Sequence, residues 1–297
     1  GTVGATKGIA EKFPDRLIGT PIAENGFTGM GLGAAINGLR PIIEIMYADF
    51  CLVAADQLFN QIAKVRHMFG GTSAVPLIVR IRAAGGHGYG SQHSMDPSGL
   101  FALWPGWRVI VPTTPFDYIG LFNSAVQCDD PVVVVETQTL FQNEGPVPAD
   151  DLDFCIPFGK ARVLRPGSAC TIVACGNMAP ICVEAVEKCG IDAEVIDPRT
   201  VDSVSLDWQT IGASVERTNR LLVAEQTSRG PSLGARIVQE GQERLFDWLD
   251  HQILRVSGTQ SAPVVSKILE QAALAGVDEV VAGIHAVMGD DAKAAAE

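Results

Sequence analysis

Mainly hydrophobic runs alternate with longer amphipathic stretches through the first half of the chain. The runs lie at residues 41–46, 75–80, 108–111 and 131–136. Runs of this kind are typical of strands that are buried on both faces of a parallel sheet. The stretches between them, at residues 28–37, 54–69 and 115–126, have helical spacing, and the last begins with Thr114 as N-cap and Pro115 at the first helical position. The pattern predicts an α/β architecture.

The alternation stops at residues 141–158, which are rich in Pro, Asp and Glu, and then starts again. The second half predicts strands at residues 170–175, 193–196, 220–224 and 252–256, with helices at residues 179–189, 207–217 and 234–249. We therefore expect two α/β domains, each a mostly parallel sheet flanked by helices. They span residues 1–145 and 159–288, with a linker at residues 146–158 and a frayed tail at residues 289–297.

Composition narrows the classes of partner. The 297 residues carry a net charge of −12, which opposes binding to nucleic acid or to anionic membranes. The seven cysteines are scattered without metal-site or disulfide spacing, so we expect free thiols in a reducing compartment. No stretch approaches the ~18 apolar residues of a membrane helix, so a soluble intracellular protein is expected. The 47% of hydrophobic residues favours association with a partner.

Ligands of parallel sheets bind on the loops that follow the carboxyl ends of the strands. The loop at residues 20–26, TPIAENG, places Glu24 before a glycine-rich helix start, where a carboxylate also fits a simple helix cap. The segment at residues 44–50, EIMYADF, carries Tyr47 and Phe50, which also fit ordinary core packing. Both loops are candidate site segments.

The loop at residues 83–94, AAGGHGYGSQHS, is the strongest candidate for a functional site. Its polar side chains include His87, Tyr89, Gln92 and His93 on a glycine-rich segment that would make a poor core. Other motifs fail: the sequence has no GxxxxGK[ST] phosphate loop and no HExxH zinc helix. GPSLG at residues 230–234 matches GxSxG, but Ser232 lies several residues beyond its strand, which indicates a loop and helix start. His67, His251 and His285 stand alone.

Several segments, taken in order, resemble the β subunits of pyruvate, branched-chain and acetoin dehydrogenase E1 components. They are TPIAENGFTGMGLGAAINGLRPIIEIMYADF, DQLFNQIAK, GSQHS, PGWRVIVPTTPFD and DDPVVVVE. EVIDPRTVDSVSLD resembles the transketolase-type C-terminal domain of that family. The resemblance runs from residue 1 to about residue 284. It implies a pyrimidine-binding domain followed by a transketolase C-terminal-like domain, with thiamine diphosphate as cofactor.

The resemblance also implies roles for single residues. Glu24 matches the glutamate that binds N1′ of the aminopyrimidine and so helps to activate the cofactor. Phe50 matches the aromatic residue that packs on the pyrimidine, and Tyr47 is expected beside it as a further cofactor contact. His93 matches the active-site histidine, which donates to the substrate oxyanion or assists acyl transfer to lipoamide. Further contacts with the substrate are expected from the same loop, at His87, Tyr89 and Gln92.

Metal-binding sites are predicted only from the resemblance to this family. Some family members hold a structural potassium ion with backbone carbonyls at the positions of Leu77, Ala125, Cys128 and Asp130. Ordinary strand and helix-end positions fit these residues equally well. The GDG motif with its following asparagine pair, which binds magnesium and the diphosphate, is absent from this sequence. An α-type E1 partner that holds Mg²⁺ is therefore implied.

The expected assembly is an α2β2 heterotetramer or a fused α–β polypeptide, with a lipoyl-bearing E2 acyltransferase as the acceptor. The match begins partway into the family pattern, so we expect residue 1 to reflect truncation, cleavage or the interior of a fused chain. The expected reaction is decarboxylation of a pyruvate-type or branched-chain 2-oxo acid and transfer of the acyl group to lipoyl-E2. The expected location is the bacterial cytoplasm, or an organellar matrix in a eukaryote.

Two alternatives remain open from the sequence. The same machinery could cleave acetoin, which EIMYADF favours mildly. A non-catalytic assembly subunit would keep the fold alone, and the joint presence of Glu24, Phe50 and His93 argues against it. A free-standing transketolase-like enzyme would need the absent magnesium motif.

Overall fold

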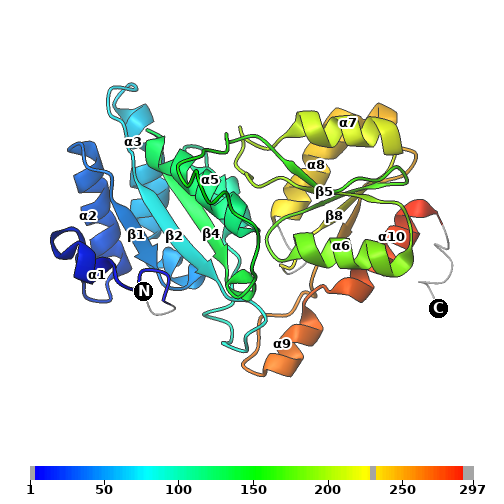
Figure 1. Ribbon diagram of the computed structural model, residues 1–297, viewed down its shortest axis with the longest axis horizontal. Coiled ribbons are helices and arrows are strands. Elements are labelled where there is room, and N and C mark those ends of the chain that lie inside the picture. Colours follow the sequence, from blue (N-terminus) through cyan, green and yellow to red (C-terminus); the bar gives the residue numbers. More distant parts are fainter. Residues whose placement is uncertain (1–3, 228–231, 290–297) are drawn as a thin grey trace.

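The computed structural model describes residues 4–227 and 232–289, which form two α/β units lying side by side (Figure 1). The first unit is built on sheet A, whose strands are all parallel and follow the order β1-β2-β4-β3. Its strands are β1 (Ile42–Ile45), β2 (Ile78–Ala83), β3 (Arg108–Ile110) and β4 (Val132–Thr137). The α/β architecture predicted from the hydrophobic runs is confirmed.

Sheet B forms the second unit, with the strand order β5-β7-β6-β8-β9. Its strands are β5 (Arg162–Arg165), β6 (Thr171–Ala174), β7 (Glu194–Asp197), β8 (Leu221–Ala224) and β9 (Leu254–Val256). All pairings are parallel except that of the edge strand β5, which runs antiparallel to β7. No strand is predicted at β5 from the sequence, because its side chains are only partly buried and half of them are arginines.

Ten α-helices lie within the described residues. They are α1 (Ile9–Lys12), α2 (Glu24–Ile36), α3 (Ala63–Met68), α4 (Ser98–Ala102), α5 (Pro115–Gln127), α6 (Met178–Cys189), α7 (Trp208–Thr218), α8 (Leu233–Leu245), α9 (Lys267–Ala273) and α10 (Val277–Met288). None of them is long and apolar enough to cross a membrane. Most of the expected tail, residues 290–297, lies outside the described residues.

Three predicted boundaries in the first unit were wrong. Helix α2 begins at Glu24, four residues earlier than predicted, so Glu24 lies in its first turn. The strand predicted at residues 75–80 is β2 at residues 78–83, because Pro76 has no N–H and the Leu77 N–H bonds to the Val75 carbonyl instead of a neighbouring strand. The helix predicted at residues 54–69 is divided into a π-helical segment, η3 (Asp56–Ile62), and α3.

The wide turns of η3 are tied to the loop before β3. Trp107 donates from Nε1 to the Leu58 carbonyl at 3.2 Å. The preceding Gly106 has φ of 105°, and a Cβ there would lie 2.0 Å from the Ala63 carbonyl oxygen. Only glycine fits this approach without a shift of the backbone.

Helices cover both faces of each sheet. In the first unit α2 packs against η3 and β1, and α5 covers the opposite face through a cluster that includes Leu121, Val132 and Val134. In the second unit α7 and α8 cover one face of sheet B, and α6 and α10 cover the other (Figure 1). Helix α5 starts as predicted, because Thr114 accepts a hydrogen bond from the Asp117 N–H and Pro115 follows.

The predicted linker packs firmly on α5. Phe154 stacks on Phe116 with ring centroids 4.6 Å apart, and the Ile156 N–H bonds to the Gly120 carbonyl. A Cβ at Gly120 would lie 2.5 Å from both Phe154 and Ile156, so the small residue permits this contact. The segment therefore forms part of the surface of the first unit.

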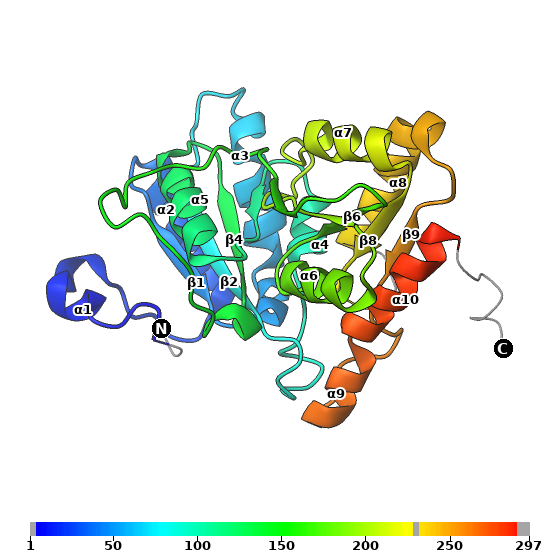
Figure 2. The ribbon, with the colours of Figure 1, turned by 45° about the vertical axis from the view of Figure 1, so that its right-hand side comes forward.

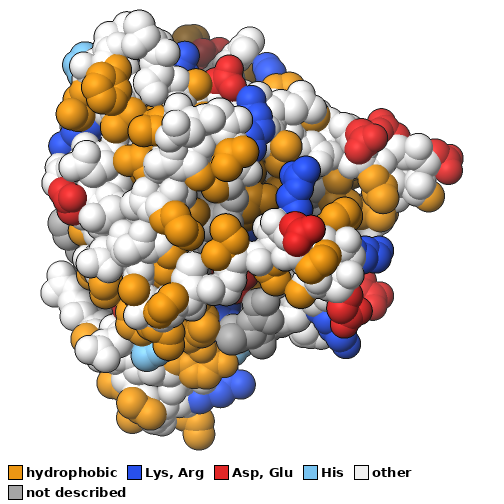
Figure 3. Space-filling view, turned by 90° about the vertical axis from the view of Figure 1, so that its left-hand side faces the viewer, with side chains coloured by type: hydrophobic (Ala, Val, Ile, Leu, Met, Phe, Trp, Pro, Cys, Tyr) orange, Lys and Arg blue, Asp and Glu red, His pale blue; other side chains and the backbone are white. Residues whose placement is uncertain are grey.

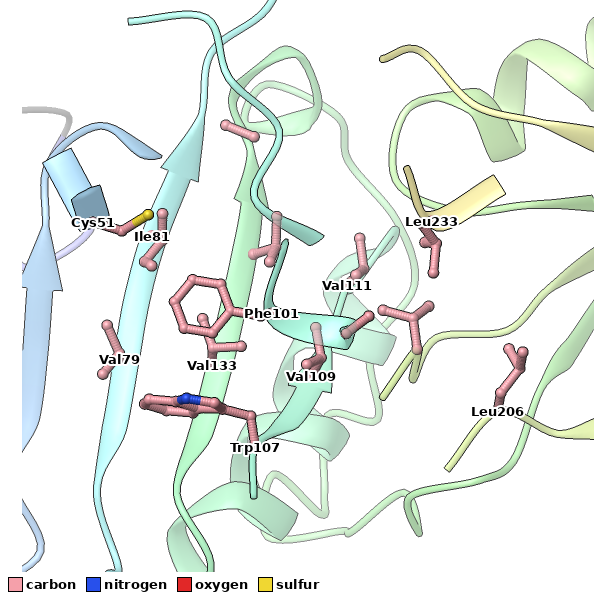
Figure 4. Close-up of a cluster of buried hydrophobic side chains, with 14 of the residues drawn as sticks. Cys51, Val79, Ile81, Phe101, Trp107, Val109, Val111, Val133, Leu206 and Leu233 are labelled. Atoms are coloured by element: carbon pink, nitrogen blue, oxygen red, sulfur yellow. The ribbon is translucent and has the colours of Figure 1, made fainter. Parts of the chain in front are cut away.

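One hydrophobic core joins the two units. Val109 and Val111 of the first unit lie beside Leu206 and Leu233 of the second, as Figure 4 shows. Backbone hydrogen bonds add to this contact, because β3 pairs in an antiparallel sense with the segment around Thr200 after β7. The two sheets thus share buried area and backbone pairing.

A buried carboxyl group lies at this contact between the units. Asp197, at the end of β7, is 0% exposed and accepts hydrogen bonds from Thr113 Oγ1 and the Arg199 N–H. Burial raises its pKa from 3.8 to about 7. The folded protein therefore holds a proton at pH 5 to 6 that the unfolded chain has already released.

We predict that Asp197→Asn changes the pH dependence of stability. The wild-type carboxyl favours the folded state fully below about pH 4, and this contribution is lost as the pH rises to about 7. The free energy of unfolding of the wild type should fall relative to that of the variant, by about 1.4 kcal/mol per pH unit in this window. Urea unfolding at pH 4.5 to 8 measures the difference, with the exposed Asp247→Asn as control. Parallel curves for wild type and Asp197→Asn would contradict the assignment.

Candidate functional site

The carboxyl ends of β1 and β2 bring the predicted aromatic residues together. Tyr47 follows β1, and its ring centroid lies 4.6 Å from that of His93 and 6.3 Å from that of Phe50. Phe50 and His93 are 5.2 Å apart in an edge-to-face contact. Tyr89 adds a further contact with Tyr47 at 5.7 Å, and His87 stacks on Tyr89 at 5.6 Å. We call Tyr47, Phe50, His87, Tyr89 and His93 the aromatic cluster.

The ends of the neighbouring strands complete this edge. Gln138, directly after β4, donates from Nε2 to the Tyr89 hydroxyl at 3.2 Å. Asp49 accepts a hydrogen bond from the Met95 N–H, which ties the loop after β1 to the loop after β2. Burial raises the pKa of Asp49, and the hydrogen bond from Met95 opposes that rise. Gln92, in the same loop, is exposed.

Glu24 lies at the start of α2, where the helix N-terminus favours a negative charge. Its side chain is 8% exposed, yet it has no hydrogen-bond or ion-pair partner among the described residues. One turn along the helix, the Thr28 hydroxyl is also buried without a partner. No contact within the described residues joins Glu24 to the aromatic cluster. The Glu24 carboxylate, whose oxygens keep contact with solvent, and the buried Thr28 hydroxyl thus lie on one helix face without a partner among the described residues.

The loop at residues 83–94 is held against α9 of the second unit, and Figure 2 shows the two side by side. The Gly88 N–H donates to Glu270 Oε2 at 2.5 Å, and Gln271 Nε2 donates to the Gly86 carbonyl at 3.2 Å. Gly88 has φ of 77°, and a Cβ there would lie 2.9 Å from Lys267 N, so glycine allows the close approach. The second unit thus positions the loop that carries His93.

Positive charge gathers beside this loop. Burial, together with the charges of Lys267 and Arg82, lowers the pKa of His87, and Glu270 opposes the effect. Arg82, near the end of β2, is 5% exposed, and its Cζ lies 3.9 Å from the centroid of the Tyr47 ring. The neutral form of His87 is therefore favoured in a region where Arg82 is already charged.

Within the strands of sheet A, before their carboxyl ends, the charged side chains form ion pairs. Arg80 makes two hydrogen bonds to Glu136, at 2.7 and 2.9 Å, and lies 3.6 Å from a Glu44 oxygen. Tyr118 of α5 donates to the same Glu136 at 2.5 Å. This pair lines an open groove of about 1770 Å³ that also includes residues of the N-terminal segment, α2 and β1. No member of the aromatic cluster lines that groove.

The residues expected to hold potassium already accept hydrogen bonds or pair with cations inside the protein. The carbonyl oxygens of Leu77 and Ala125 accept from Val132 N and Cys128 N. The Cys128 carbonyl accepts from Arg40 Nη1 at 2.8 Å. The Asp130 carboxylate pairs with Arg66 and Arg108. Potassium binding at this place stays a prediction.

The remaining sequence motifs have structural roles where they are described. Ser232 of GPSLG is the N-cap of α8 and accepts from the Ala235 N–H, so the predicted helix start is confirmed; the two residues at 230–231 lie outside the described residues. All seven cysteines are free. Cys155 is the exposed one.

Three residues of the site are absent from the sequence prediction. They are Arg82, Gln138 and Glu270, whereas Asp49 lies in the predicted candidate segment at residues 44–50. Arg82 had a signal, because a second arginine in the apolar run VRIRA must be buried if the run is a strand. Glu270 had none, because its contact with Gly88 joins positions 182 residues apart.

Comparison with known families identifies two matching regions. Residues 1–143 match the family described as "Transketolase, pyrimidine binding domain", and residues 159–280 match "Transketolase, C-terminal domain". Among solved structures, a chain titled "Split gene transketolase, inactive beta4 tetramer" superposes with a TM-score of 0.76. The match covers 96% of this chain and 88% of that one at 22% sequence identity, which supports the fold alone.

Curated relatives are closer in sequence. The β subunit of acetoin:2,6-dichlorophenolindophenol oxidoreductase from Bacillus subtilis is 37% identical over 296 residues, which cover 98% of this chain and 85% of the relative. The mitochondrial pyruvate dehydrogenase E1 component subunit beta-1 from Oryza sativa subsp. japonica is 38% identical over 287 residues, which cover 95% and 76%. Both matches run through the first unit, the segment on α5 and the second unit.

We predict that Glu270→Ala loosens the loop at residues 83–94. Loss of a hydrogen bond to a charged acceptor is worth about 1.5 to 3 kcal/mol, so local opening should become about 10- to 100-fold more frequent. Amide hydrogen exchange at residues 86–92 measures this opening. The exposed helical variant Glu243→Ala is the matched control and should leave the loop unchanged. Equal protection in wild type and Glu270→Ala would show that other contacts hold the loop.

Proposed function

The chain belongs to the family of E1 β subunits of pyruvate and acetoin dehydrogenases, and on that premise we propose that it acts in decarboxylation of a 2-oxo acid. The reaction depends on thiamine diphosphate and ends with transfer of the acyl group to a lipoyl group on E2. The observation that carries the proposal is the Glu24 side chain at the start of α2, which is only 8% exposed and has no hydrogen-bond or ion-pair partner among the described residues.

The residues present fit the pyrimidine end of the cofactor. The Glu24 carboxylate and the buried Thr28 hydroxyl have no partner among the described residues, and a pyrimidine ring offers ring nitrogens and an amino group. Phe50 is only partly buried, so its ring has a face available for stacking on another ring. Tyr47 contacts Phe50 and supports it from behind. The magnesium–diphosphate end has no matching motif in this sequence, which assigns that end to an α-type partner.

Each side chain then has a defined task. Thiamine diphosphate, when bound, supplies the carbon nucleophile and the electron sink that decarboxylation of a 2-oxo acid requires. Glu24 shares a proton with N1′ of the pyrimidine, in a site where low exposure strengthens that hydrogen bond. Phe50 orients the ring. His93 donates a proton or hydrogen bond to the substrate oxygen, and Tyr47 and Phe50 fix its imidazole by edge-to-face contact.

The N-terminal side of the first unit supports association with the α-type partner. Figure 3 shows hydrophobic side chains gathered over this side. Among the described residues 4–42, the exposed large hydrophobic ones are Ile9, Phe13, Leu17, Ile18, Ile22, Met30, Ile36, Leu39 and Ile42. Ile22, two residues before Glu24, is 91% exposed. An apolar surface of this extent is typical of a protein interface.

The complex that follows from this proposal contains α-type chains that bind Mg²⁺ and a lipoyl-bearing E2. The α-type chain is either a separate subunit of an α2β2 heterotetramer or the other half of a fused polypeptide. The compartment follows the host, which is the cytoplasm for a bacterium and an organellar matrix for a eukaryote. The potassium site at Leu77, Ala125, Cys128 and Asp130 is part of the proposal as a structural site only.

Glu24→Gln should lower kcat by about 100-fold or more, because general acid–base groups contribute 10²–10⁴-fold. The assay is 2-oxo acid-dependent reduction of 2,6-dichlorophenolindophenol by the chain reconstituted with its α-type partner, thiamine diphosphate and Mg²⁺. Assembly with the partner should be unchanged, which size-exclusion chromatography checks. The exposed Glu216→Gln is the control. Full activity of Glu24→Gln would exclude this mechanism.

Acetoin cleavage is the second candidate, supported by the identity to the Bacillus subtilis acetoin oxidoreductase subunit. The same assay discriminates the two functions when acetoin replaces the 2-oxo acid. A kcat/KM for acetoin above that for every 2-oxo acid would favour the second candidate. Turnover of neither substrate class would favour a non-catalytic assembly subunit.

A further inference from the structure

Arg82 is a buried cation that stacks on Tyr47 but has no hydrogen-bond or ion-pair partner among the described residues. It is 5% exposed, and both Nε and Nη2 lack solvent contact and a hydrogen-bond acceptor. No carboxylate of the described residues forms an ion pair with it. A buried charge is unfavourable unless it is paired, so an anion from outside the chain would stabilise this guanidinium.

The sheet itself cannot supply that anion. Glu136 lies opposite Arg82 in the register of β2 and β4. However, Glu136 accepts both hydrogen bonds of Arg80 and a third from Tyr118. Glu44 of β1, which lies opposite Arg80 in the strand register, is also next to Arg80, at 3.6 Å. The carboxylates of Glu136 and Glu44 therefore both pair with Arg80, and neither of them pairs with Arg82.

The position of Arg82 connects it to the proposed active site. Its guanidinium lies over the face of the Tyr47 ring. The same ring also makes an edge-to-face contact with the imidazole of His93. Stacking on an aromatic face leaves the in-plane N–H groups of arginine free for a planar anion such as a carboxylate. An anion at Arg82 would thus be separated from His93 by one aromatic ring.

The chemistry of the proposed reaction distinguishes two carboxylates. A 2-oxo acid loses the charge of its 1-carboxylate as CO2 leaves. Tight ion pairing of that group would stabilise the substrate more than the transition state and would slow the reaction. A carboxylate at the far end of the substrate keeps its charge throughout, so an ion pair with it stabilises substrate and transition state alike.

We infer that Arg82 is a specificity-determining residue that binds a distal carboxylate, so that the substrate is a dicarboxylic 2-oxo acid. This inference rests on the proposed function, because it places the substrate at the same site. It narrows the substrate class from neutral acyl chains to an anionic one. Tyr47 positions the guanidinium and separates it from His93.

The test compares two substrates of equal chain length, 2-oxoglutarate and 2-oxopentanoate, with the reconstituted complex. The wild type should show a higher kcat/KM for 2-oxoglutarate. Arg82→Met should lower that value by about 10- to 100-fold, mainly through KM, because a charged hydrogen-bond partner is lost. The loss should be larger than any loss with 2-oxopentanoate, and size-exclusion chromatography with the α-type partner shows whether the variant folds and assembles. Arg165→Met, at a partly exposed arginine of β5, is the matched control and should change neither substrate.

A ligand measurement keeps the inference testable apart from turnover. Glutarate, but not the monocarboxylate butyrate, should raise the melting temperature of the wild-type complex and should have no effect on Arg82→Met. Equal kcat/KM for both substrates, or no distinction between glutarate and butyrate, would overturn the inference and leave the proposed function intact. Loss of partner binding in Arg82→Met would also overturn it, since Arg82 would then pair with the partner. Absence of turnover with all substrates, with glutarate binding retained, would reject the proposed function alone.

Discussion

Parallel pairing of β1, β2 and β4 is the constraint on which the candidate site depends. Parallel strands end at the same edge, so the segments after them meet even though they are far apart in sequence. Tyr47 follows β1, His93 lies in the loop after β2, and Gln138 follows β4. Their contacts through Tyr89 and Tyr47 arise from this alignment. A slip of one residue in β2 would turn Arg82 to the other face and separate it from Tyr47.

Charge is distributed unevenly along this sheet. In its middle, Arg80 and Glu136 satisfy each other and fix the register of β2 and β4. Near the carboxyl ends of its strands, Glu24, Thr28 and Arg82 have low exposure and no hydrogen-bond or ion-pair partner in the described residues. The polar groups in the middle of the sheet thus have partners within the chain, whereas those near the strand ends are free to bind a cofactor, a substrate or a partner chain.

Sequence reasoning predicts the architecture, and the structure brings the predicted Tyr47, Phe50 and His93 into contact, but the residues that support them are missed. Buried strands are identified well because hydrophobic runs reflect burial, and Glu24, Phe50 and His93 lie where ligands of parallel sheets bind. Strand β5 is not predicted from the sequence, because an edge strand need not be hydrophobic. Arg82 escapes because the strand is expected to end at residue 80, and the contact of Glu270 with Gly88 depends on how two units pack.

The antiparallel pairing of β3 with the chain around Thr200 has a consequence for the molecule in the cell. β3 is the edge of sheet A, and an uncovered edge offers N–H and C=O groups to any passing strand. The first unit emerges from the ribosome before residues 199–201 are made, so this edge stays open during synthesis. Nascent chains are therefore most prone to aggregate in that interval, and completion of the second unit closes it.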